Sequence, residues 1–139
     1  MNSLNVLGTD YKLIVKGYKE EKAFKRRNMF GYCDGYAKEI VVCDPSTYPG
    51  MKNDGFETND AFFRCILRHE IVHAFMFESG LAQNSDSSNA WAMNEEMVDW
   101  IARQGIKLNA AWAEAESKLE AWFDTKSGRM TWKEKANET

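Results

Sequence analysis

The chain has 139 residues, of which 44% are hydrophobic and 28% are charged, and its formal net charge is −3. This length and balance fit a single folded domain and exclude a disordered chain, a collagen and a coiled-coil rod. The acidic balance argues against nucleic acid as the main partner.

No apolar run approaches the roughly 20 residues that cross a bilayer. Residues 1–10 have neither the basic start nor the apolar core of a secretion signal. The three cysteines are Cys33, Cys43 and Cys65, an odd number without a Cys-x-x-Cys pair. We expect reduced thiols in a cytoplasmic protein without a membrane segment, with a Cys33–Cys43 bridge as the weaker alternative.

The first third of the chain predicts strands and turns. Residues 4–7 and 11–15 are short β-type runs. Residues 31–44 predict a β-hairpin that turns at an Asp-Gly pair. Within this hairpin, the β-branched run Ile40–Val42 suits a strand that is buried on both faces.

A basic segment separates these strands. Between Tyr11 and Phe30 there are seven Lys and Arg residues against two Glu residues, which gives a local charge of +5. The pattern favours a solvated helix or loop. A docking surface for an acidic partner is the alternative.

A helix is predicted after a loop over residues 45–57. Its N-cap is Asp60, with Asn59 as the alternative, and Gly80 occupies the position of a C′ glycine. Apolar residues and histidines recur at helical spacing between these ends, at Phe62, Ile66, His69, His73 and Phe77.

Two further helices are predicted beyond a mobile polar loop at residues 82–89. The first runs from about Ala90 to Gln104 and ends at Gly105. The second covers 109–123, and we expect its aromatic stripe, including Trp112, Trp122 and Phe123, to pack in the core. The fold class is α+β, a small N-terminal sheet packed on three helices. One domain spans residues 1–124, and 125–139 form a polar C-terminal tail that frays.

The only two histidines of the chain lie in one motif, His69-Glu70-Ile71-Val72-His73. Four residues advance a helix by about 400° and 6 Å, so both imidazoles leave the same face one turn apart. Two nitrogens at that spacing can bind one metal ion at about 2.0–2.1 Å each. Glu70 lies beside this face, where it can reach a water bound to the metal.

A third ligand must come from elsewhere, because catalytic zinc takes three protein ligands and a water. Glu95 and Asp99 share a face of the next predicted helix, since they are four residues apart. We expect Glu95 to complete the site and Asp99 to accept the outer N–H of a histidine ligand. Glu96 is the alternative ligand, while Cys65, one turn before His69, is expected to be a small core residue.

These residues resemble a family. His-Glu-x-x-His followed by Asn94-Glu95 and Asp99 is similar to the gluzincin metallopeptidases, typified by thermolysin. The resemblance implies a minimal zincin-like domain with His69, His73 and Glu95 as zinc ligands, Glu70 as general base and Asp99 supporting a ligand. The chain also resembles small phage and prophage metallopeptidase-like proteins, and more distantly the ImmA/IrrE group. The features that carry this resemblance are its small size, its β-hairpin and the segment Leu67–Phe75. A phage-encoded protein would act in the host cytoplasm.

The leading hypothesis is a zinc-dependent peptide hydrolase with a protein or peptide substrate. We expect the substrate to add to the sheet edge along Lys38–Cys43. Tyr32, Tyr36 or Tyr48 would stabilise the oxyanion, and nothing in the sequence selects among them. The alternatives are a non-catalytic, zinc-stabilised partner-binding protein and, less favoured, a non-haem iron oxygenase.

Overall fold

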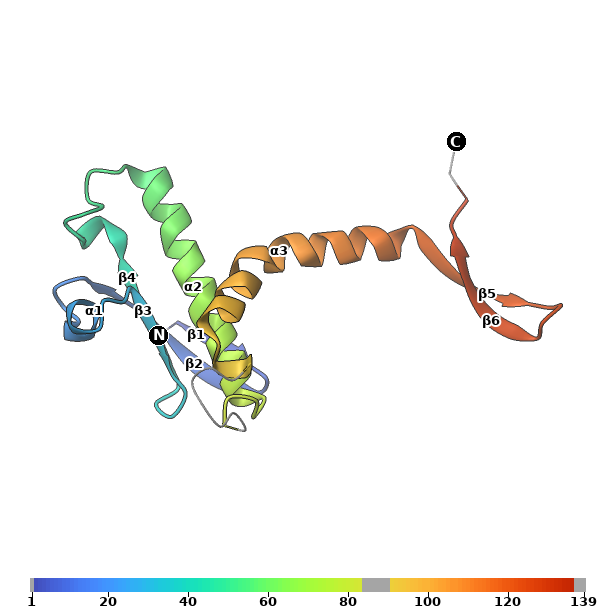
Figure 1. Ribbon diagram of the computed structural model, residues 1–139, viewed down its shortest axis with the longest axis horizontal. Coiled ribbons are helices and arrows are strands. Elements are labelled where there is room, and N and C mark those ends of the chain that lie inside the picture. Colours follow the sequence, from blue (N-terminus) through green and yellow to red (C-terminus); the bar gives the residue numbers. More distant parts are fainter. Residues whose placement is uncertain (1, 84–90, 137–139) are drawn as a thin grey trace. The chain divides into compact units, whose positions relative to one another are not determined.

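The computed structural model describes residues 2–83 and 91–136 (Figure 1). The protein has mixed α+β structure, as the sequence predicts. Contacts divide the chain into two compact units, residues 1–103 and residues 104–139. Within the described part of the chain, no helix has the length and hydropathy needed to span a membrane.

The first unit contains a four-stranded sheet in the order β1-β2-β4-β3. Strands β1 (Ser3–Val6) and β2 (Thr9–Gly17) pair antiparallel. Strands β3 (Gly31–Asp34) and β4 (Glu39–Asp44) form the predicted hairpin. Strand β4 also pairs in parallel with β2, so it is an interior strand.

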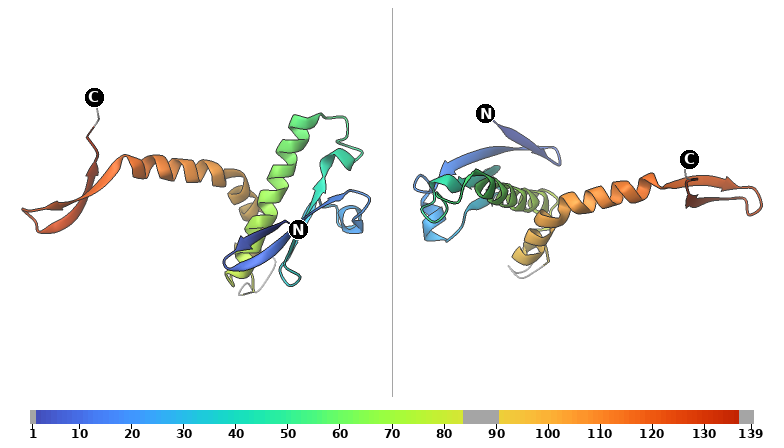
Figure 2. Two further views of the ribbon diagram at one scale, coloured as in Figure 1. Left: turned by 180° about the vertical axis from the view of Figure 1, so that it is seen from behind. Right: turned by 90° about the horizontal axis from the view of Figure 1, so that it is seen from above.

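The expectation that β4 is buried on both faces is confirmed. Ile40 and Val42 belong to one core cluster, which includes Ala74 of helix α2 (Phe56–Glu78). Val41 belongs to a second cluster with Phe24 of helix α1 (Lys22–Arg26). Because side chains alternate along a strand, the two helices cover opposite faces of the sheet. Figure 2 shows α2 lying along one of these faces.

Helix α2 begins at Phe56, five residues before the first helical residue that an N-cap at Asp60 predicts, so the caps proposed at Asp60 and Asn59 are wrong. The N-cap is Gly55, whose φ of 87° belongs to the left-handed region that glycine tolerates. Asp60 lies inside the helix, and its carboxylate accepts a bond from Arg64 Nε at 2.9 Å. The other end agrees with the sequence, because Gly80 has a φ of 84° just after the helix.

Two glycines let β3 and its turn approach α2 closely. A Cβ atom on Gly31 would lie 2.7 Å from Ile66 Cγ2 and 3.2 Å from Glu70 Cγ. A Cβ atom on Gly35 would lie 2.4 Å from the ring of Phe77. The absence of side chains at these two positions therefore sets the distance between the sheet edge and the histidine helix.

Glu78 fastens the C-terminal end of α2 to the sheet. Its carboxylate accepts hydrogen bonds from Tyr11 Oη at 2.6 Å and Thr9 Oγ1 at 3.0 Å, and it pairs with the ammonium group of Lys38. The bond from Lys38, followed by those from Tyr11 and Thr9, lowers the pKa of Glu78 below its usual 4.5. This carboxylate is therefore committed to the fold rather than to the histidines.

The helix predicted from about Ala90 to Gln104 is present from Glu95 onward, but the predicted break at Gly105 before a separate helix from Asn109 is wrong. The structure has a 3₁₀ turn, η2 (Trp91–Met93), and one helix, α3 (Glu95–Ser117), that continues through Gly105. A single glycine costs only about 1 kcal/mol relative to alanine inside a helix, so it need not end one. The predicted mobile loop at 82–89 lies mostly outside the described residues.

In the second unit, the sequence after Lys118 forms a hairpin of β5 (Leu119–Asp124) and β6 (Arg129–Glu134). The predicted helix to Phe123 is therefore wrong beyond Ser117, and the predicted frayed tail is wrong over Arg129–Glu134. Residues 137–139 of that tail lie outside the described residues. The turn between β5 and β6 favours a hairpin over a helix, because Gly128 has a φ of 70° and its N–H donates to Asp124 O at 2.8 Å. The aromatic stripe does not pack in a core either, since Trp112 is 60% and Phe123 is 56% exposed.

We expect Gly31→Ala to lower the free energy of unfolding by about 1–3 kcal/mol, because the new methyl group overlaps Ile66 and approaches the backbone of Val41. Gly105→Ala is the matched control. A Cβ at Gly105 would meet nothing within 4 Å, so this helical substitution should stabilise by roughly 0.5–1 kcal/mol. Urea unfolding followed by circular dichroism measures both. Equal effects of the two substitutions would contradict the close approach.

We expect the contacts of Glu78 to make part of the folding stability depend on pH. A carboxyl group whose pKa is lowered in the folded state adds stability above its unfolded value of 4.5 and loses that contribution as pH falls through the lowered folded value. Unfolding curves from neutral to acidic pH should therefore converge for the wild type and Glu78→Gln below pH 4.5. At neutral pH the variant should be less stable. Glu116→Gln, at an exposed position of α3, should parallel the wild type throughout.

Candidate metal centre

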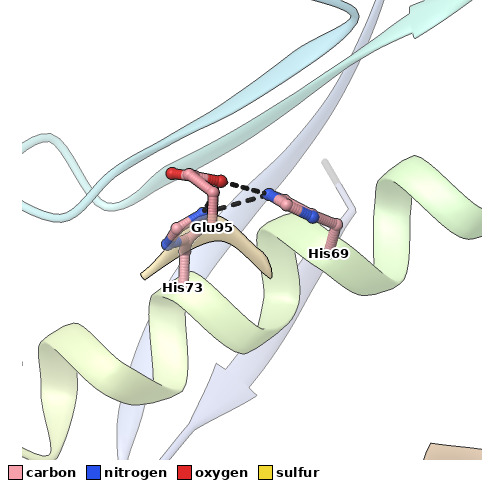
Figure 3. A group of neighbouring side chains, drawn as sticks. All are labelled: His69, His73 and Glu95. Carbon is pink, nitrogen blue, oxygen red and sulfur yellow. Dashed lines mark hydrogen bonds and ion pairs between the residues drawn. The ribbon is translucent and has the colours of Figure 1, made fainter. Parts of the chain in front are cut away.

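The two histidines rise from the same face of α2, as their spacing predicts (Figure 3). Their Nε2 atoms are 3.1 Å apart. Both side chains are mostly buried, with exposed fractions of 16% for His69 and 21% for His73. Burial lowers the pKa of His73, while the nearby Glu95 carboxylate partly opposes this effect. A neutral imidazole with a free lone pair is the form that a metal requires.

Glu95 completes the group from the first residue of α3. Its Oε2 atom lies 2.9 Å from His69 Nε2 and 3.2 Å from His73 Nε2. Asn94 explains why α3 begins here, because its side chain accepts the Met97 N–H at 2.9 Å as an N-cap. The structure thus brings Glu95 to both imidazoles, and Glu96 makes no such contact among the described residues.

Asp99, one turn after Glu95, contacts the far side of the first imidazole. Its Oδ1 atom lies 3.3 Å from His69 Nδ1, and its Oδ2 atom accepts a 2.7 Å bond from Arg103 Nε. The bond from Arg103 is the main reason that the pKa of Asp99 is lowered, with His69 adding to it. An ionised Asp99 can accept the N–H of His69 Nδ1, and in that tautomer the Nε2 lone pair is free for a metal ion.

The donor atoms fit a zinc ion. Their separations of 2.9, 3.1 and 3.2 Å form a nearly equilateral triangle. Tetrahedral zinc with bonds of about 2.05 Å holds its ligand atoms about 3.3 Å apart. The three donor atoms could therefore hold one metal ion. An imidazole N–H that donates to Glu95 is the other arrangement that these distances allow.

Glu70 lies on the sheet side of α2 and is 7% exposed. Burial raises its pKa to about 7; His69 acts against this shift and Glu95 adds to it. The thiol of Cys33, on β3, is half-buried. Desolvation raises its pKa to about 12, with a further contribution from Glu70. Cys33 therefore stays a neutral thiol, and all three cysteines are free.

A cleft of about 860 Å³ contains the triangle, Glu70 and Asp99. Strand β3 lines it, and the outer edge of β3 pairs with no other described strand. The expectation that a substrate adds along Lys38–Cys43 is therefore wrong, because the backbone groups of β4 are already paired with β2 and β3. The free edge beside the histidines belongs to Gly31–Asp34.

The three tyrosines proposed for the oxyanion make their contacts away from the triangle. The hydroxyl of Tyr32 donates to Glu21 at 3.2 Å, on the sheet face that α1 covers. Tyr36 is 87% exposed and packs against Phe77. Tyr48 packs against Phe30. None of the three hydroxyl groups is placed at the triangle.

Sequence reasoning missed Arg103 and the free edge of β3. Arg103 follows Asp99 by four residues, so the i,i+4 rule that selects Glu95 and Asp99 could have found it. The edge position of β3 depends on the parallel pairing of β2 with β4, for which local sequence carries no signal. Comparisons with protein-family models, curated proteins and solved structures found no match. The gluzincin resemblance therefore rests on the motif residues alone.

We expect purified protein to bind one zinc ion and Glu95→Gln to abolish this stoichiometric binding, because a neutral amide replaces the carboxylate between the imidazoles. Glu96→Gln is the matched control and should keep the ion. Metal analysis after dialysis and competition with a chromogenic chelator give the two affinities. Equal losses in both variants would contradict the ligand set, and so would a metal-free wild type in excess zinc.

Proposed function

We propose that this protein is a zinc-dependent peptide hydrolase with His69, His73 and Glu95 as the metal ligands and Glu70 as the general base. One observation carries the proposal: three donor atoms from two helices converge within 3.2 Å in a cleft that also holds a buried carboxyl group. A site that served stability alone would have no need for Glu70, and structural zinc sites are usually closed by four Cys or His ligands.

Zinc bound to the triangle supplies Lewis acidity, which acidifies a water molecule and polarises a carbonyl group. The chain's own residues do the rest. Glu70 takes a proton from the attacking water as the new C–O bond forms. It then delivers that proton to the leaving amine as the peptide C–N bond breaks. Asp99, held by Arg103, keeps the imidazole of His69 in the tautomer that presents Nε2 to the ion.

The free edge of β3 is where we place the substrate backbone. An extended peptide can add there as a further strand, and main-chain hydrogen bonds then bind it without regard to side-chain identity. The close packing of Gly31 on Ile66 and Glu70 brings that edge next to the general base. A peptide seated on β3 thus lies beside Glu70.

A non-catalytic, zinc-stabilised binding protein is the second candidate. It is favoured by the positions of Tyr32, Tyr36 and Tyr48, since none of their hydroxyl groups reaches the triangle to stabilise an oxyanion. Both candidates share the metal ligands. They differ in whether Glu70 acts as a general base.

Glu70→Gln separates the two candidates. The amide keeps the size of the side chain but cannot take up a proton, so cleavage of fluorescently labelled casein should fall roughly 10²–10⁴-fold. Zinc content and thermal unfolding should stay close to the wild type. Cleavage by the wild type that Glu70→Gln leaves intact would refute this mechanism. A wild type that binds zinc but cleaves no peptide would favour the binding protein.

A further inference from the structure

A basic hollow lies next to the cleft. Its volume is about 730 Å³, and it is lined by residues of the β2–α1 corner and of α1: Tyr18, Lys19, Glu21, Lys22, Lys25 and Arg26. We call it the α1 hollow. Four of the six lining side chains are cationic, and all four of these residues are exposed. Four of the seven basic residues between Tyr11 and Phe30 are therefore gathered on one concave surface.

The one carboxylate of the α1 hollow does not neutralise these cations. Glu21 accepts bonds from Lys16 Nζ at 2.9 Å, from Ala23 N at 3.2 Å and from Tyr32 Oη at 3.2 Å. The bond from Lys16 is the main cause of its lowered pKa. Within residues 2–83 and 91–136, no ion pair involves Lys19, Lys22, Lys25 or Arg26.

The α1 hollow adjoins the cleft through consecutive residues. Arg26 lines the hollow, whereas Arg27 and Asn28 line the cleft. The chain then enters β3 at Gly31, so the end of the free edge leads toward Arg27. Tyr32 joins the two surfaces, because it lines the cleft and its hydroxyl bonds to Glu21 of the hollow.

We propose that the α1 hollow binds an acidic segment of a peptide whose neighbouring residues lie along β3. This proposal rests on the proposed function, because it assigns a substrate class to the same cleft. An extended peptide that pairs with β3 and continues past Gly31 reaches Arg27 and then the four cations of the hollow. Asp and Glu side chains at those positions meet charges that form no ion pair with the described part of the chain.

The charges of the cleft favour a peptide over nucleic acid. Glu70, Glu95 and Asp99 line the cleft with carboxyl groups, whereas the lining of the α1 hollow is mostly cationic. A nucleic acid carries a negative charge at every phosphate and would meet these carboxylates wherever it crossed the cleft. A peptide can be acidic at one end and neutral at the other, which matches this arrangement.

Charge reversal tests the hollow without requiring catalysis. The probe is fluorescein-labelled octaglutamate, and its binding is followed by fluorescence anisotropy at low and high salt. We expect Lys22→Glu/Lys25→Glu to weaken binding roughly tenfold at low salt, since it replaces attraction by repulsion. The matched control, Lys107→Glu/Lys126→Glu, makes the same change of net charge at exposed positions outside the hollow and should bind within about twofold of the wild type.

Equal losses in both double variants would overturn the proposal, because net charge alone would then explain binding. An oligothymidylate of eight nucleotides that binds the wild type as tightly as octaglutamate would also overturn it. Lys22→Gln/Lys25→Gln, with circular dichroism, guards against misfolding and should show an intermediate loss. A loss in the Glu variant without any loss in the Gln variant would contradict direct contact.

Cleavage supplies a second, separate readout. In a mixture of peptides from a digested proteome, Asp and Glu should be enriched on one side of the bonds that the wild type cuts. That enrichment should vanish in Lys22→Glu/Lys25→Glu and persist in the control variant. If the wild type cuts no peptide, the proposed hydrolase fails, while octaglutamate binding still decides the hollow. Cleavage without acidic enrichment would refute the substrate class and leave the hydrolase intact.

Discussion

Two imidazoles one helical turn apart can share a third donor only if that donor arrives at a single point above the helix face. In this protein the point is occupied by Oε2 of Glu95, 2.9 and 3.2 Å from the two Nε2 atoms. Asn94 starts α3 so that Glu95 is its first residue, and Asp99 then falls one turn later against His69. The position of one helix N-terminus therefore sets both the triangle and the support of its first imidazole.

This arrangement needs α2 to be fixed on the sheet, and the structure fixes it at two levels. Gly31 and Gly35 remove side chains where β3 and its turn meet the helix, so the backbone of the cleft edge lies against Ile66, Glu70 and Phe77. The C-terminal end of α2 is tied by the polar contacts of its last residue with β2 and the β3–β4 turn. Fold stability and site geometry thus depend on the same helix–sheet interface.

The sequence predicts the parts of this architecture that local periodicity determines. The i,i+4 rule brings His69 to His73 and favours Glu95 over Glu96, and the Asp-Gly pair marks the β3–β4 turn. Features that depend on competition between weak signals are missed. Gly105 does not end α3, because one glycine costs less than the remaining helix gains, and the strand β5 replaces a predicted helix because its turn to β6 is well formed. The free edge of β3 follows from sheet order, which only the tertiary structure specifies.

Net charge conceals how charge is distributed over the first unit. The whole chain is acidic, at −3, yet the residues around α1 are strongly basic and the cleft centre holds three carboxyl groups. Carboxylates beside the imidazoles attract a cation, while the exposed lysines that line the α1 hollow attract an anion. A ligand that satisfies both must change its charge character over a few residues. A polypeptide can do this, because acidic and neutral residues can follow one another in any order along its sequence.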